Sequence, residues 1–270
     1  MKSNRIYVVD AFADRPFVGN PAAVLPMTEG EAQDACLMQL IALEMNLAET
    51  AFVIPMPDLG QDHFGLRWFT PAVEVELCGH ATLAAAHILW ETGSVKSGQR
   101  ISFHTLSGVL LADPVKNAIH LNFPAERAVG ECLPRLPKFL GEPVFTGRNR
   151  MDWLVELKPG TDLTQLSPNL LEIESLGMRG LIVTSASPGG SEVDFVSRFF
   201  APQSGVNEDP VTGSAHCCLG PYWAEKLGKL ELKGYQASAR GGVVSVIVRD
   251  DRVILGGRAV TSLEGTLRCI

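Results

Sequence analysis

Arg67-Trp68-Phe69-Thr70-Pro71 is followed, eight residues on, by Gly79-His80-Ala81-Thr82, and Arg198-Phe199-Phe200-Ala201-Pro202 is followed, eleven residues on, by Gly213-Ser214-Ala215-His216. Each pair leads into an apolar stretch that ends at a glycine. The two copies are separated by about half of the 270-residue chain. An arrangement repeated at this distance predicts two equivalent domains, each with the same junction between a loop and a helix.

The two helices predicted after these junctions are apolar all round. Ala81–Trp90 and Ala215–Trp223 have almost no polar face, and a helix of this kind is buried on every side. Runs rich in apolar residues and bounded by turn residues predict strands, among them Glu49–Ile54 and His63–Phe69. The strands come in runs rather than in steady alternation with helices. We therefore expect an α+β fold of two pseudo-symmetric domains, each a mainly antiparallel or mixed sheet wrapped around a central buried helix.

The repeat also predicts the domain ranges. An N-terminal domain is expected over residues 1–120, with or without the C-terminal strand 259–270. A C-terminal domain is expected over residues 121–258, and the active site is expected in the cleft between the two. Both ranges are of ordinary domain size.

Composition narrows the class of protein. A net charge of −7 argues against a nucleic-acid binder. No apolar run approaches the length of a membrane span. The short run Ile6–Asp10 is expected to be a first strand rather than the apolar region of a signal peptide. The six cysteines show no C-x-x-C pattern, which favours reduced thiols and a cytoplasmic location. The six histidines are scattered, so the sequence predicts no metal site.

The helix starts at Gly79 and Gly213 are candidate anion or carboxylate sites. The first turn of a helix carries unpaired N–H groups and a partial positive charge, and glycine lets a ligand approach the backbone closely. The alternative is that both glycines only make tight turns. Two matched copies, each with a polar residue directly after the glycine, favour ligand binding.

Three further side chains have two readings each. Asp209 either caps the second helix or binds a substrate amine or hydroxyl. Glu49 stands among apolar neighbours, a setting that suits general acid/base work, but its spacing alone favours an ordinary glutamate at a strand start. Cys78 precedes a helix N-terminus that lowers a thiol pKa, or it is a small buried residue. A two-thiol racemase needs a second cysteine at the matching turn, and residues 209–212 hold none.

Four motifs, in this order along the chain, resemble the PhzF family, the phenazine-biosynthesis-like isomerases. They are Asp10–Phe12 with Phe17–Val24, Asn46–Phe52, Leu77–Thr82 and Glu208–Ala215. The resemblance runs from the first strand to the C-terminal hairpin. It implies a diaminopimelate-epimerase-like fold, with two similar domains and an active site between them. One departure is the segment Gln236–Gly242, which lacks the family's proline.

The resemblance also implies roles for single residues. Glu49 would be a single base that removes a proton from one carbon and returns it to another. His80, Asp209 and Ser214 would complete the catalytic set, and Asn20, Gly79 and Gly213 would bind the substrate. The resemblance also implies a homodimer, and it implies no cofactor.

Three functions therefore compete. The first is a cofactor-independent isomerase of a small carboxylate-bearing substrate, with Glu49 as the base. The second is an amino-acid epimerase or racemase that uses Cys78. The third is a non-catalytic binding protein on the same fold. The expected catalytic residue types at all four family positions favour an enzyme.

Overall fold

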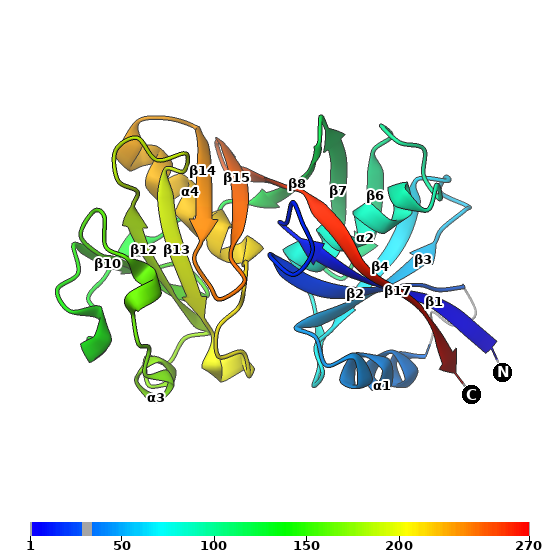
Figure 1. Cartoon of the computed structure of the whole chain (residues 1–270), viewed down its shortest axis with the longest axis horizontal. Coiled ribbons are helices and arrows are strands. Elements are labelled where there is room, and N and C mark those ends of the chain that lie inside the picture. The colour runs from blue at the N-terminus through cyan, green and yellow to red at the C-terminus, as the bar shows by residue number, and fades with distance from the viewer. Residues whose placement is uncertain (1, 29–33, 270) are drawn as a thin grey trace. The chain divides into compact units, whose positions relative to one another are not determined.

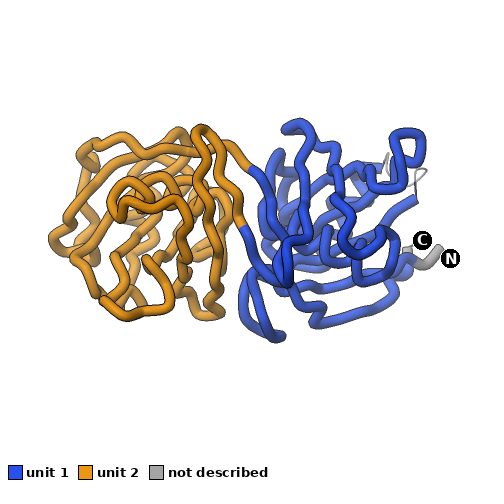
Figure 2. The backbone as a smooth tube through the Cα atoms, turned by 90° about the horizontal axis from the view of Figure 1, so that it is seen from above, with its two compact units in different colours: residues 1–122, 256–270 blue, residues 123–255 orange. Residues whose placement is uncertain are grey.

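The computed structural model describes residues 2–28 and 34–269. The chain divides into two compact units, residues 1–122 with 256–270 and residues 123–255 (Figure 2). Residues 1, 29–33 and 270, which fall within the predicted domain ranges, lie outside the described part. In that part, no helix is both long and apolar enough to cross a membrane.

Unit 1 is a mixed sheet with two helices among its described residues. Its strands pair in the order β17, β1, β2, β3, β4, β6, β7, β8, and the short β5 pairs with β4. The N- and C-terminal strands β1 and β17 are therefore neighbours (Figure 1). The elements are β1 (Lys2–Ala11), β2 (Asn20–Pro26), α1 (Ala35–Met45), β3 (Glu49–Pro55), β4 (His63–Phe69), β5 (Glu74–Val75), α2 (Gly79–Glu91), β6 (Ile101–Thr105), β7 (Gly108–Val115), β8 (Ala118–Pro124) and β17 (Ala259–Cys269).

Unit 2 repeats this plan. Its strands pair in the order β9, β10, β11, β12, β13, β14, β15. The chain enters unit 2 within β8 and leaves it within β16. The elements are β9 (Val129–Gly130), η1 (Lys138–Leu140), β10 (Phe145–Arg148), β11 (Asp152–Glu156), η2 (Leu163–Gln165), α3 (Leu170–Glu174), β12 (Gly180–Ala186), β13 (Phe195–Phe200), η3 (Pro202–Ser204), α4 (Gly213–Leu227), β14 (Glu231–Gln236), β15 (Gly242–Arg249) and β16 (Arg252–Gly257).

The strand directions show that the sequence repeat is a repeat of topology. In unit 1, β2 is parallel to β3, β3 antiparallel to β4, β4 parallel to β6 and β6 antiparallel to β7. In unit 2, β11, β12, β13, β14 and β15 follow the same four steps. In both units the helix of the repeat crosses between the two parallel strands that flank it. The predicted α+β class with two similar halves and mixed sheets is confirmed.

The repeated helices are the buried centres of their units. Every residue of α2 from His80 to Ala86 is buried, and so is nearly all of α4 from Gly213 to Ala224. Close approach requires small residues: a Cβ added at Gly220 would lie 2.7 Å from a methyl carbon of Val246 on β15. The predicted burial of both helices on all sides is confirmed.

The opposite face of each sheet carries a second apolar core. In unit 1, Met38, Ile41 and Ala42 of α1 pack with Phe52 and other side chains of β1 to β4. In unit 2, Ile173 of α3 packs with side chains of β11, β12 and β13. Each sheet is therefore covered on both faces, which holds its strand ends in fixed register.

The arginine that opens each copy of the repeat fastens the loop before the helix. Arg67 makes a bidentate ion pair with Glu74, with N–O distances of 2.7 and 2.8 Å. Arg198 makes the same pair with Glu208, also at 2.7 and 2.8 Å. Bidentate pairs of this kind fix direction as well as distance. The repeated arginines therefore have a structural role in the loops that lead into α2 and α4.

Candidate active site

Glu49 and His80 meet in unit 1. Glu49 is the first residue of β3, beside Ala22 of β2, and His80 is in the first turn of α2. The Glu49 Oε2 and His80 Nε2 atoms are 3.2 Å apart, and the two side chains are 19% and 5% exposed. No described group makes a directed hydrogen bond to His80 Nε2, so this contact is close but not aligned. Such contacts often tighten only when substrate binds.

His80 is neutral in this setting. Burial lowers its pKa to about 3, because an imidazolium loses its hydration in the protein interior. At neutral pH it therefore offers one N–H donor and one bare nitrogen. It can pass a proton or hold a substrate oxygen, but it is not a standing positive charge beside Glu49.

Cys78 completes this group. Its Sγ is 3.5 Å from Nδ1 of His80, and the residue is 6% exposed. Ligand atoms of Glu49, Cys78 and His80 all lie within 4.8 Å of one another, a set that could hold a metal ion. The sequence pattern could not predict this set, since its members follow no ligand spacing and meet only through the packing of α2 against the sheet.

The helix N-terminus beside this group has no side-chain cap. Cys78 is the N-cap of α2, and its side chain makes no capping hydrogen bond. The amides of the first turn, beginning at Gly79, therefore have no side-chain acceptor at the cap. This agrees with the predicted substrate-binding role of Gly79, which stays a prediction.

Asn20 lies at the same end of the parallel pair β2–β3 as Glu49. It is fully buried and begins β2, two residues before the partner of Glu49 in the parallel pair β2–β3. The loop before it is held in a constrained shape. The Phe17 amide donates to Oδ2 of the buried Asp10 at 2.8 Å. A Cβ at Gly19, whose φ is +69°, would lie 2.2 Å from the Ala11 carbonyl oxygen, so only glycine fits there.

In unit 2, Asp209 is tied to the turn before α4. The Thr212 hydroxyl donates to Asp209 Oδ2 at 2.5 Å. Gln236, which is fully buried, closes the turn from the other side. Its Oε1 accepts from the Thr212 amide at 2.9 Å, and its Nε2 donates to the Asp209 carbonyl at 2.7 Å. The turn therefore has a single shape, and Asp209 has a fixed place in it.

Ser214 contacts an arginine that the sequence analysis missed. Arg179 Nη2 donates to Ser214 Oγ at 2.9 Å, and Arg179 is also paired with the buried Asp152 at 2.5 and 2.8 Å. Burial opposes the charge of Arg179, but hydrogen bonds to Asp152 and the charges of Asp152 and Asp209 outweigh it, so its pKa is raised. Only an indirect sequence signal pointed to this contact. Asp152 and Arg179 stand at the starts of two neighbouring parallel strands, and the starts of parallel strands lie at the same end of a sheet.

The structure thus brings together Glu49 and His80 in unit 1, and Asp209, Thr212 and Ser214 in unit 2. The two sets belong to different units, and their predicted union in one cleft stays a prediction. As in unit 1, the N-cap Thr212 of α4 makes no capping hydrogen bond to the helix. Gly213 therefore begins a second helix whose first amides lack a side-chain acceptor at the cap.

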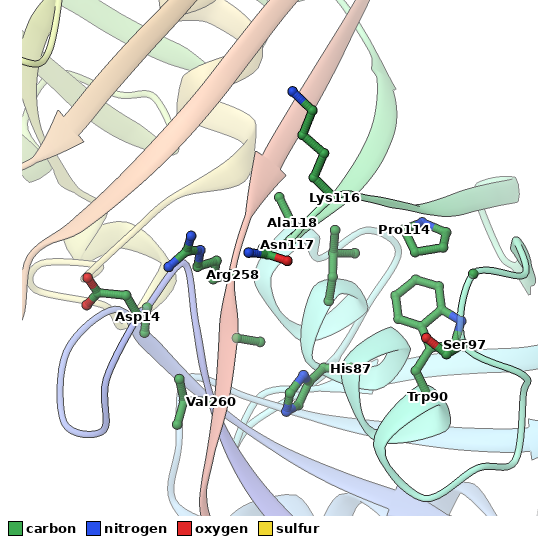
Figure 3. Close-up of a pocket in the computed structure, with 14 residues that line it drawn as sticks. Asp14, His87, Trp90, Ser97, Pro114, Lys116, Asn117, Ala118, Arg258 and Val260 are labelled. Atoms are coloured by element: carbon green, nitrogen blue, oxygen red, sulfur yellow. The ribbon is translucent and has the colours of Figure 1, made fainter.

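A pocket of about 440 Å³ lies elsewhere in unit 1. His87 and Trp90 of α2 line it, with Asp14 and Arg258 on the other side (Figure 3). None of the predicted site residues is among its lining residues. His87 and Trp90 stand two to three turns after His80 along α2, so this pocket is separate from the predicted chemistry.

Comparisons with known proteins identify the family of the chain. The family model described as phenazine biosynthesis-like protein, PhzC-PhzF, matches residues 9–265. A protein of Halalkalibacterium halodurans, named an uncharacterized isomerase, is 51% identical over 99% of both chains. The crystal structure of a PhzF-family phenazine biosynthesis protein from Enterococcus faecalis superposes with a TM-score of 0.89 at 38% identity, over 99% of this chain and 100% of that one.

A more distant structure shows the fold alone. A hydroxyproline epimerase from Agrobacterium vitis superposes with a TM-score of 0.64 at 11% identity, over 98% of this chain and 92% of that one. The resemblance drawn from the four sequence motifs and the epimerase-like fold that it implied are both confirmed. The chain belongs to the phenazine biosynthesis-like (PhzC-PhzF) family of isomerases.

Proposed function

We propose that this isomerase moves a proton between two carbons of a small carboxylate-bearing substrate, without a cofactor, and that Glu49 is its general acid/base. The observation that carries the proposal is the close contact between Glu49 and the neutral, buried His80. A carboxylate at the start of a strand is usually exposed to water. Here its side chain is 19% exposed, and its neighbour brings no permanent charge.

The proposed reaction needs no oxidant or reductant. Glu49 takes a proton from a carbon next to a carboxylate or a conjugated system, and the C–H bonding electrons remain on the substrate. The carboxyl proton of Glu49 exchanges with solvent, and Glu49 then delivers a proton to a second carbon and returns to its ionised form. Amides at helix N-termini, at Gly79 and Gly213, stabilise the negative charge that develops between these steps.

The other predicted residues bind and orient the substrate in this proposal. His80 holds a substrate oxygen or relays a proton as a neutral imidazole. Asp209, fixed by Thr212 and Gln236, accepts from a substrate hydroxyl or amine. Ser214, held by Arg179, and the buried Asn20 contact the substrate near the two helix starts.

The test begins with a screen of small carboxylates for thermal stabilisation of the protein. Ligands that stabilise it are then incubated in D₂O, and deuterium at carbon is measured by mass spectrometry. Glu49→Gln should reduce exchange by about 10²- to 10⁴-fold, the usual contribution of a general acid or base, and should leave stabilisation by the ligand. Glu44→Gln, an exposed glutamate on α1, is the matched control. Full exchange in Glu49→Gln would overturn the proposal.

An epimerase that uses Cys78 is the second candidate, because Cys78 lies 3.5 Å from His80. A pair of bases on opposite faces of one carbon would need a partner in unit 2. Thr212 stands where the second thiol would be, and the nearby Cys218 is buried with its pKa raised to about 12 by desolvation. Undiminished turnover in Cys78→Ala would exclude this candidate, and its loss together with inversion of a stereocentre would support it.

A non-catalytic binding protein is the third candidate. A binding protein on this fold would give ligand stabilisation with no deuterium exchange in the wild type. The homodimer that the resemblance implies would have twice the 29.1 kDa chain mass, which light scattering after size-exclusion chromatography measures directly. The expected cytoplasmic location of the protein can be tested by imaging or cell fractionation.

A further inference from the structure

We propose that Glu49, Cys78 and His80 also form a binding site for a soft divalent cation, Zn²⁺ or Cd²⁺, and that the bound cation inhibits the enzyme. These three residues are named the thiol–imidazole–carboxylate cluster. They supply a sulfur, a nitrogen and an oxygen ligand, the three ligand types that zinc accepts in proteins. Thiolate is also the ligand that selects soft metals over Mg²⁺ and Ca²⁺.

The spacing of the cluster comes close to that of a tetrahedral site, and one ligand must move inward to complete it. Bonds of about 2.0 to 2.3 Å at tetrahedral angles place neighbouring ligand atoms roughly 3.5 Å apart. His80 lies 3.2 Å from the Glu49 carboxylate and 3.5 Å from the Cys78 sulfur. The two contacts use opposite nitrogens of the imidazole ring. A metal bound to one nitrogen must therefore draw in the ligand that contacts the other nitrogen, and that ligand's atom starts within 4.8 Å of the other two ligand atoms. A cation with longer bonds needs the smaller movement, so Cd²⁺ should bind at least as well as Zn²⁺.

The three ligands come from a stiff frame. Glu49 begins β3, Cys78 is the N-cap of α2, and His80 lies in its first turn. The turn between β4 and α2 is fastened by the Arg67–Glu74 pair. A buried neutral imidazole already has the protonation state that a metal requires, and binding would release the thiol proton.

Three protein ligands leave one coordination position for water or another ligand, as in zinc sites with an open position. The cation would occupy a lone pair of the Glu49 carboxylate. If Glu49 is the base of the proposed function, an occupied cluster cannot take a proton from carbon. The inhibition therefore rests on the proposed function, whereas the binding does not.

Unit 2 serves as an internal comparison. The positions that match Cys78 and His80 in the repeat are Thr212 and Ser214, which offer neither thiol nor imidazole. The cation Arg179 lies against Ser214 and repels a second positive charge. Binding at the repeated helix starts should therefore be confined to unit 1.

The experiment uses reduced full-length protein freed of metal by a chelator. Cys36 and Cys132 are exposed thiols, and exposed thiols can bind soft metals by themselves, so Cys36→Ser and Cys132→Ser are combined as the reference background. Cd²⁺ is titrated while the ultraviolet absorption of the thiolate–cadmium bond is followed, and Zn²⁺ is titrated by calorimetry. One equivalent of each should bind tightly. Cys78→Ser and His80→Asn, added singly, should each weaken binding at least about tenfold.

Unchanged cadmium absorption and zinc affinity in Cys78→Ser would overturn the site. If that variant does not fold, alkylation of the reference protein decides: Zn²⁺ should slow modification of Cys78 at least about tenfold in peptide maps, and no protection would overturn the site. Deuterium exchange with and without one equivalent of Zn²⁺ tests inhibition separately. Metal binding with undiminished exchange would refute the inhibition alone. Exchange that survives Glu49→Gln would refute the proposed base and leave the metal site standing.

Discussion

The N-termini of α2 and α4 have the same strand framework around them but different polar side chains. Phe69 pairs with Thr50 across β4 and β3, and Phe200, its counterpart in the repeat, pairs with Leu181 across β13 and β12. Glu49 of unit 1 therefore corresponds to Gly180 of unit 2. The residue after the first glycine is His80 in one unit and Ser214 in the other. Unit 1 presents an acid and an imidazole, and unit 2 presents a hydroxyl beside the cation Arg179.

Packing explains why unit 2 has no matching carboxylate. A Cβ added at Gly180 would lie 2.5 Å from Cζ of Phe199, so no side chain fits at that position. Its neighbour Arg179 lies over the Phe199 ring and pairs with Asp152. The comparison shows that the repeated residues hold the scaffold and the unrepeated residues carry the chemistry. Each prediction below changes one member of a matched pair.

The largest effect is expected at the repeated arginines. Arg198 is 10% exposed, and besides Glu208 it donates to the carbonyls of Leu163 and Leu166 at 2.9 and 3.0 Å. Arg198→Met leaves a carboxylate and two carbonyls without their partner, and it should reduce the free energy of unfolding by about 3 to 5 kcal/mol.

Arg67→Met is the matched change in unit 1. Arg67 is 26% exposed and pairs with Glu74, which is 25% exposed. Its loss should reduce the free energy of unfolding by roughly 1 to 2 kcal/mol, since Arg67 is more exposed than Arg198 and water can more easily replace its bonds. Urea denaturation of both variants measures the difference. Equal losses would show that the deeper burial of Arg198 does not raise its contribution.

The second effect is on activity. His80→Ser gives unit 1 the residue of unit 2, and removes the imidazole from the Glu49 carboxylate. Deuterium exchange with the ligands found in the screen should fall at least about tenfold, within the range of a lost proton-transfer partner. Because the helix N-terminus remains, thermal stabilisation by the ligand should change little. Loss of ligand binding with normal turnover at saturation would instead make His80 a binding residue only.

Much of the frame was predictable from the sequence because it depends on local patterns. The repeat predicted two similar halves, and the absence of a polar face on Ala81–Trp90 predicted a helix buried on every side. The strands expected over Glu49–Ile54 and His63–Phe69 are found over Glu49–Pro55 and His63–Phe69. These features follow from periodicity and turn chemistry over a few residues.

The site was less predictable because its contacts join residues distant in sequence. Spacing alone favoured an ordinary surface role for Glu49, and only the motif resemblance assigned it to the chemistry. Arg179 and Gln236 were missed as partners of Ser214 and Asp209, since an arginine before a strand and a glutamine at a strand end are common. Their roles arise from strand register, which places Asp152 beside Gly180 and the end of β14 beside the turn before α4.

The third prediction concerns acid stability. Burial lowers the pKa of His80 to about 3, and burial lowers that of His216 to about 4 although its bond to the Thr212 carbonyl opposes the shift. In the unfolded chain both take up protons below a pH of about 6.5. The unfolded state then binds more protons, so stability should fall as pH drops from 6.5 toward 4, by up to about 1.4 kcal/mol per unit for each histidine.

His216→Thr separates the two contributions. In unit 1 the matching residue Thr82 donates its hydroxyl to the Cys78 carbonyl, so threonine can close the same turn. Denaturant unfolding between pH 6.5 and 4 should show a shallower loss of stability in His216→Thr than in the wild type, from a lower starting value because a cavity is left. Parallel curves for the two proteins would mean that His216 does not take part in the acid response.

The smallest effect is expected at Ser214. Ser214→Ala removes one hydrogen bond from Arg179, whose two bonds to Asp152 remain. It also removes the hydroxyl that we propose to contact the substrate. One hydrogen bond contributes about 0.5 to 1.5 kcal/mol, so the concentration of ligand needed for half-maximal exchange should rise roughly three- to tenfold while the maximal rate changes little. The exposed Ser204→Ala is the control. If Ser214→Ala lowers the maximal rate as much as His80→Ser does, both helix starts take part in proton transfer. The expectation that the helix start of unit 1 transfers protons while that of unit 2 only binds substrate would then be wrong.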